Sequence, residues 1–143
     1  ESFLREFLRR EQTRYTVGSP HIEWQAEDLD QVAANYLPNM RSDVVLTSSD
    51  SRILIEAKCT ARMIAPAYQG DRPKLRSEHL YQVLNYLKHL EPGAPTTGML
   101  LYAQSGSALS LDFTLGGHHL KIRSLNLDQP WEGIHHDLLE LVA

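Results

Sequence analysis

The stretch RSDVVLTSSDSRILIEAKC, residues 41–59, decides the fold, because it has the pattern of two strands joined by a tight turn. Val44, Val45 and Leu46 precede the turn sequence SSDS, and the apolar run 53–55 follows it. β-branched residues favour strands, and Ser and Asp favour turns. The stretch therefore predicts an antiparallel hairpin with strands at 41–47 and 52–59.

Charged residues end the second strand of this hairpin, where an apolar core strand would not carry them. Lys and Glu are rarely buried without partners. If Thr47 pairs with Arg52 across a symmetric turn, the register sets Asp43 opposite Glu56. Lys58 points to the same face, since it follows Glu56 by two residues. One face of the hairpin is thus predicted to gather Asp43, Glu56 and Lys58.

Two opposed carboxylates repel each other and need a compensating cation. Mg²⁺ fits, because it is usually held by one or two carboxylates with waters and phosphate oxygens. Such a metal would activate water and polarise a phosphoryl group. The Ala57 carbonyl is a further candidate ligand, and Lys58 could orient the attacking water. The alternative is a solvent-facing salt bridge from Glu56 to Lys58 or Arg41.

A helix is predicted from Ser77, as its N-cap, to Leu90, followed by the helix-ending sequence EPG. Its apolar stripe has helical spacing and consists of Leu80, Val83, Leu84, Leu87 and Leu90. The opposite face carries hydrogen-bonding side chains: Gln82, Asn85, Tyr86 and His89. Gln82 and Tyr86 suit a phosphate or a metal-bound water, and the alternative is an ordinary solvated face.

The remaining patterns complete an α/β fold with a central mixed β-sheet flanked by helices. We expect a helix at 1–12, a short strand at 19–25, a helical turn within 26–39, a long loop at 60–76, a buried strand at 97–104, a hairpin around Gly116 and Gly117, and a last helix at 128–142. In the last helix, Asp128 is the expected cap and Trp131 points inward. Trp24 is also expected in the core.

Composition limits the class of protein. A chain of 143 residues predicts one domain, and its net charge of −4 argues against a surface that binds nucleic acid everywhere. The single cysteine, Cys59, fits a reducing cytoplasm and a small buried role. No apolar run approaches the ~20 residues of a membrane span. The cysteine content leads us to expect a cytoplasmic protein. Because the chain begins at Glu1 and not at Met, we expect a fragment or one domain of a longer protein.

Three sequence segments together resemble the PD-(D/E)xK nuclease superfamily: SDVVL (42–46), LIEAK (54–58) and LYQVLNYL (80–87). The spacing from Gln82 to Tyr86 is like the Q-x-x-x-Y element of its RecB-type branch. The longer stretch 37–58 and the closing W…I…DLL pattern are similar to the C-terminal nuclease domain of the McrC family. McrC proteins are the cleavage subunits of McrBC systems, which restrict DNA containing modified cytosine. The similarity covers residues 1–142.

The resemblance implies a restriction-endonuclease-like fold over 1–143 and a Mg²⁺-dependent endonuclease acting on double-stranded DNA, with Mn²⁺ as a possible substitute. It implies that Asp43 and Glu56 are metal ligands and that Lys58 is the catalytic lysine. Gln82 and Tyr86 would support the site from the helix.

Some members add an acidic ligand from the first helix, for which Glu1 is the preferred match and Glu6 the other. The implied partner is a GTP-driven AAA+ motor subunit of the McrB type. The chain has no phosphate-binding glycine loop of the Walker type, so it is not itself the motor. Two alternatives stay open: a RecB-type exonuclease or repair nuclease, and a non-catalytic interaction module that keeps the fold.

The chain departs from the superfamily pattern in two places. Ser42 stands where the superfamily's name has proline. The segment between the hairpin and the helix is less easily matched, and its cations outnumber its acidic residues: Arg62, Arg72, Lys74 and Arg76. These cations could form a basic lip over the DNA backbone, or the segment could be a solvated loop.

Overall fold

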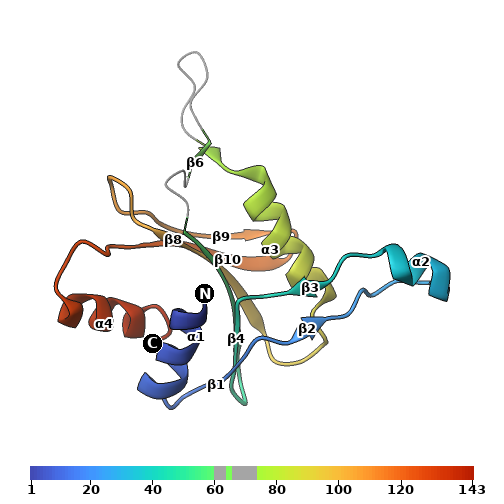
Figure 1. Ribbon diagram of the computed structural model, residues 1–143, viewed down its shortest axis with the longest axis horizontal. Helices are drawn as coiled ribbons and strands as arrows, with labels where there is room; N and C mark the ends of the chain where they lie inside the picture. Colours follow the sequence, from blue (N-terminus) through green and yellow to red (C-terminus); the bar gives the residue numbers. More distant parts are fainter. Residues whose placement is uncertain (60–63, 66–73) are drawn as a thin grey trace.

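A six-stranded mixed sheet forms the centre of the molecule in the computed structural model, which describes residues 1–59, 64–65 and 74–143 (Figure 1). The strands lie in the order β1 (Thr16–Gly18), β4 (Val44–Thr47), β5 (Arg52–Lys58), β8 (Thr96–Ala103), β10 (His118–Leu125) and β9 (Ser110–Leu115). β8 is parallel to both of its neighbours, and the outer pairs are antiparallel. The predicted α/β fold is confirmed and is compatible with a restriction-endonuclease-like fold.

Helices cover both faces of this sheet (Figure 1). α1 (Ser2–Glu11) and α4 (Trp131–Glu140) lie on one face, and α3 (Ser77–His89) lies on the other. Successive strand residues point to opposite faces, so each strand contributes to both cores. Ile55 packs in the core under α1 and α4, whereas Leu54 packs under α3. No helix among the described residues is long and apolar enough to cross a membrane.

The hairpin register predicted from the turn is confirmed. Thr47 lies opposite Arg52, and the ladder continues to Val44 opposite Ile55. The predicted strand 41–47 is nevertheless wrong at its start, because the ladder stops at Val44. Met40–Arg41 forms β3, which pairs with β2 (His21–Ile22) in a separate two-stranded sheet.

Ser42 gives the physical reason for this break. Its side chain is fully buried, and its hydroxyl donates to the Ile55 carbonyl at 3.0 Å. Ser19 Oγ in turn donates to the Ser42 carbonyl at 2.7 Å. Side-chain hydrogen bonds thus replace ladder bonds at this point, and the chain turns away from β5 just before Asp43.

α3 approaches the sheet closely because β8 carries a glycine beneath it. A Cβ atom at Gly98 would lie 2.7 Å from Leu87 Cδ1 and 3.1 Å from Val83 Cγ1, closer than packed atoms tolerate. Gly98 therefore sets the distance between α3 and the sheet.

Several predicted helix ends and loops differ from the structure. Ser77 is the first helical residue of α3 and not its cap, and α4 is preceded by Pro130, so that Asp128 is not its cap. The 26–39 region contains α2 (Gln31–Tyr36), whose N-terminus is capped by Asp30. The predicted 19–25 strand is reduced to β2, and β1 was not predicted.

The predicted loop 60–76 contains two short paired strands, β6 (Ile64–Ala65) and β7 (Lys74–Leu75). Residues 60–63 and 66–73 lie outside the described residues, and with them Arg62 and Arg72 of the predicted basic lip. The Gly116–Gly117 hairpin is confirmed, and both glycines have the positive φ angles, 59° and 79°, that its turn requires.

Two residues that were predicted to be buried, Trp131 and Cys59, are exposed. Trp131 is the first residue of α4 and is 50% exposed, although it makes edge contacts with Phe3 and Phe7 of α1. Cys59 is exposed, because it follows the last residue of β5. Trp24 does pack against the core under α3, although it remains partly exposed.

Candidate active site

Two carboxylates meet where β5 ends and the chain enters β4. Asp43 Oδ2 accepts a hydrogen bond from the Ala57 amide at 2.8 Å. The Asp43 amide lies 3.4 Å from Glu56 Oε2, to which it donates. Each carboxylate therefore contacts the backbone of the opposite strand segment, and this holds the pair together beyond the last ladder bond.

Lys58 joins this pair to α3. Its Nζ lies 3.3 Å from Glu56 Oε1 and donates to Gln82 Oε1. Gln82 Nε2 donates in turn to the Tyr86 hydroxyl at 3.0 Å. Glu56, Lys58, Gln82 and Tyr86 thus form one continuous chain of hydrogen bonds, which fixes the lysine between the strand and the helix.

The negative charge of the pair is only partly compensated. Burial, together with the nearby Asp43 charge, raises the pKa of Glu56 to about 7, although Lys58 opposes this rise. Burial also raises the pKa of Asp43, against the stabilising effect of the Ala57 amide. Both carboxyls would become more acidic beside a further cation.

The donor set fits a hard divalent metal such as Mg²⁺. Asp43 and Glu56 offer carboxylate oxygens, and neither histidine nor cysteine contributes a described contact to them. Within the described part of the chain no group of three or more His, Cys, Asp or Glu side chains could hold a metal ion. A two-carboxylate site is nevertheless usual for Mg²⁺, which keeps several waters. Zn²⁺ sites have more protein ligands, commonly His or Cys.

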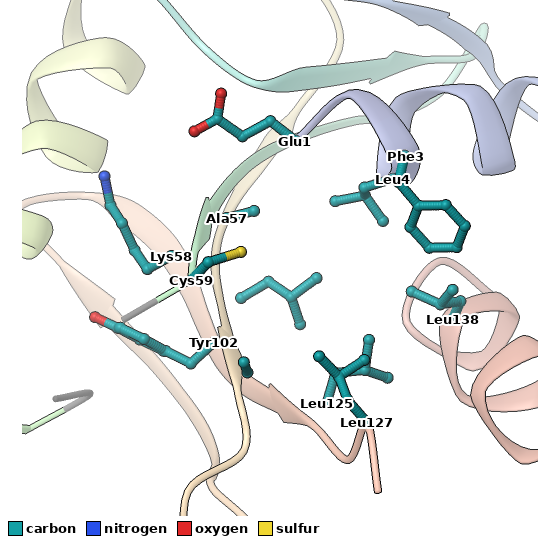
Figure 2. A pocket seen from close by; sticks show the side chains of 12 residues that line it. Glu1, Phe3, Leu4, Ala57, Lys58, Cys59, Tyr102, Leu125, Leu127 and Leu138 are labelled. Atoms are coloured by element: carbon teal, nitrogen blue, oxygen red, sulfur yellow. The ribbon is translucent and has the colours of Figure 1, made fainter. Parts of the chain in front are cut away.

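Glu1 lies near this pair without joining it. It is exposed at the start of α1, and its charge contributes to the raised pKa of Asp43. Figure 2 shows its carboxylate extending away from the apolar side chains around it, above Ala57. Glu1 as a ligand stays a prediction, whereas Glu6, the other choice, pairs with Arg9.

An apolar cavity of about 110 Å³ opens beside the site, between the start of α1 and the ends of β5 and β8 (Figure 2). Glu1, Lys58 and Cys59 lie at its polar side, and leucines form most of the remaining wall. The exposed thiol of Cys59 therefore faces a cavity and not the core predicted for it.

The polar face of α3 is not solvated at its C-terminal half. Tyr86 is 9% exposed and His89 is 7% exposed. His89 Nδ1 accepts the Gln25 amide at 2.9 Å and its ring packs against Trp24, while Asn85 Nδ2 lies 3.2 Å from Met40 Sδ. This face packs against the β2–β3 region, so the alternative of a solvated face is wrong for Tyr86 and His89.

Three residues near the site were missed by sequence reasoning. Arg5 Nη1 lies 3.4 Å from the Asp43 carbonyl, to which it donates. His79 and Tyr102 form a hydrogen-bonded pair of 2.9 Å beside Lys58. His79 lies three residues before Gln82, and this helical spacing was the signal that could have identified it. Arg5 offered no such signal, because its position depends on how α1 packs.

Comparison with known proteins relates the chain to a restriction enzyme. No protein-family model matches the chain. The chain is 30% identical, over 143 residues, to a protein of Escherichia coli (strain K12) named "Type IV methyl-directed restriction enzyme EcoKMcrBC". The match covers 99% of this chain but 40% of that protein.

This similarity supports an McrC-like relationship, as the sequence resemblance implied. The chain thus spans less than half of the length of the relative.

Proposed function

We propose that this chain is a Mg²⁺-dependent DNA endonuclease domain of the PD-(D/E)xK type, and that it is the cutting module of a modification-dependent restriction complex. The observation that carries the proposal is the contact network of Asp43, Glu56 and Lys58 at the end of the central hairpin. A surface salt bridge would explain Glu56 and Lys58 alone. It would not explain a second carboxylate at a buried site with too little positive charge.

In this proposal Asp43, Glu56 and the Ala57 carbonyl hold Mg²⁺. The Ala57 amide points to Asp43, and in a strand the carbonyl of the same residue points to the same side. The bound ion would polarise the phosphodiester and make a water molecule more acidic. Asp43 and Glu56 would hold the ion at the end of β5.

Lys58 acts on the water and the phosphate. Its ammonium group lies between Glu56 and Gln82, and among the described residues its third hydrogen has no other partner, so it can bond the attacking water or a phosphate oxygen. Charge that develops on phosphate during attack is stabilised by such a donor. Gln82, held by Tyr86, orients the lysine for this role.

The proposed partners are double-stranded DNA and a GTP-dependent motor subunit of the McrB type. The relative's name as a methyl-directed restriction enzyme supports this assembly. The net charge of −4 also favours delivery of DNA by a partner, since an acidic domain attracts DNA weakly by itself.

Titration of the protein with Mg²⁺ and Mn²⁺ by calorimetry tests the metal site. We expect one or two ions to bind near neutral pH, and we expect Asp43→Ala to weaken this binding at least tenfold while the fold is kept. If neither metal binds, with or without DNA, the domain is a non-catalytic module.

A RecB-type exonuclease is the second candidate, and the Gln82–Tyr86 hydrogen bond favours it, since this pair is the RecB-like element. Closed circular DNA separates the two. An endonuclease opens and linearises the circles, whereas an obligate exonuclease leaves them intact and degrades linear DNA only.

A further inference from the structure

A histidine and a tyrosine form a hydrogen-bonded pair beside Lys58. Tyr102 is fully buried, and its hydroxyl lies 2.9 Å from His79 Nδ1. His79 lies in the first part of α3 and is partly exposed. A polar pair with one member in the core and the other open to the site can present a fixed hydrogen-bonding group to a ligand.

The pair belongs to the same end of the molecule as the proposed metal site. Lys58 and Tyr102 lie opposite each other on neighbouring parallel strands, and Figure 2 shows them extending to the same side. His79 precedes Gln82 by one helical turn, and Gln82 contacts Lys58 Nζ. The Lys58 charge acts on His79, which places the imidazole within electrostatic range of the lysine.

The hydrogen bond fixes the tautomer of His79. Tyr102 remains protonated, because burial raises its pKa to about 12. Its hydroxyl hydrogen has no other acceptor among the described contacts, so it donates to His79 Nδ1. Burial and the Lys58 charge lower the pKa of His79, which favours the neutral ring. A neutral imidazole that accepts at Nδ1 carries its proton on Nε2.

We propose that His79 is a DNA-binding residue, and that its Nε2–H donates to a phosphate oxygen beside the phosphodiester that is cleaved. The proposal rests on the proposed nuclease function. A neutral donor suits this position, because Lys58 already supplies positive charge and a second cation beside it would be repelled. The Tyr102 hydroxyl acts as a positioning group that keeps Nε2–H available.

A purely structural role is the competing explanation, since His79 also satisfies the buried Tyr102 hydroxyl. His79→Ala alone would leave that hydroxyl without a partner and could unfold the protein. The double substitution His79→Ala with Tyr102→Phe avoids this, because removing both partners of a hydrogen bond costs little. His79→Gln is the second variant, because its amide retains an N–H donor on a side chain of similar reach.

The experiment measures DNA cleavage by the full-length protein with its motor subunit, at several DNA concentrations, for wild type and both variants. We expect the double variant to raise KM roughly tenfold or more, as expected for loss of a hydrogen bond to a charged group. We expect kcat to change less, and we expect His79→Gln to recover much of the affinity. Mn²⁺ affinity should stay unchanged in both, since neither removes a proposed ligand.

His119→Ala is the matched control, because His119 is exposed on β10 opposite Thr97, toward the other end of the strands from Lys58. It should leave KM unchanged.

A double variant with wild-type KM, or a His79→Gln variant no better than the double variant, would overturn the role of His79. The nuclease proposal would then stand, because wild type still cleaves. If neither the wild-type protein nor the Asp43→Ala variant cleaves DNA, the nuclease proposal itself fails.

Discussion

Glu56 shows how a single residue can oppose the stability of its own fold. Glu56 is 4% exposed and lies beside Asp43, so burial and then this charge raise the pKa of its carboxyl from 4.5 to about 7. The folded state therefore binds the proton more tightly than the unfolded chain. This contribution to stability is complete below pH 4.5 and is lost as pH rises through 7.

Glu56→Gln should remove this dependence. In metal-free buffer at pH 8 we expect the variant to be more stable than wild type by on the order of 3 kcal/mol, since one pKa unit corresponds to about 1.4 kcal/mol. Below pH 4.5 the two should be similar. Urea unfolding at both pH values measures the difference, and parallel pH dependence of the two proteins would contradict the explanation.

Residues of the site differed in how well their sequence context predicted them. Asp43, Glu56 and Lys58 could be grouped because a strand has a period of two and the turn length fixed the register. Ser42 could not be interpreted in this way, because its buried hydrogen bond to Ile55 depends on the folded backbone. The position of Arg5 beside Asp43 likewise depends on tertiary packing.

For helix α3, too, the sequence predicted only part of the packing. Its leucine stripe predicted the helix and the side that faces the sheet. Its second buried face, with Tyr86 and His89, packs against the β2–β3 region, and the path of that region is not encoded in the periodicity of the helix. A sequence pattern that assigns one helix face to solvent therefore underestimates how much of a helix with two buried faces is covered.

Gly98 offers a test of this packing. Gly98→Ala should push α3 from the sheet and destabilise the protein by about 1–3 kcal/mol, as overpacked cores do. Cleavage should fall as well, because α3 carries Gln82, which holds Lys58. Urea unfolding and the cleavage rate measure the two effects.

Gly18→Ala is the matched control for this element. Gly18 also lies in a strand of the sheet, but a Cβ atom there would meet only Pro20 Cδ, at an ordinary 3.9 Å. We expect a change in stability below about 1 kcal/mol for this variant. Equal destabilisation by both substitutions would mean that close packing under α3 is not what Gly98 provides.

The chain as a whole has a net charge of −4, and the site of Asp43 and Glu56 also carries more negative than positive charge. We therefore expect this chain alone to bind DNA weakly, with a Kd of about 1 μM or higher at physiological salt, as for non-specific binding. Fluorescence anisotropy with a labelled duplex, with and without the motor subunit, measures this. Strong, salt-sensitive binding by the chain alone would show that delivery by a partner is not needed.

In the proposed function, Asp43, Glu56 and Lys58 form a metal-dependent DNA-cleaving site. Its most direct test is cleavage of closed circular modified DNA by the full-length protein with its motor subunit, GTP and Mg²⁺. We predict linear products from wild type, none with EDTA, and at least a thousandfold loss for Asp43→Ala and Lys58→Ala, although both variants stay folded. Cleavage by Asp43→Ala at the wild-type rate would contradict the role of Asp43 as a metal ligand of the nuclease.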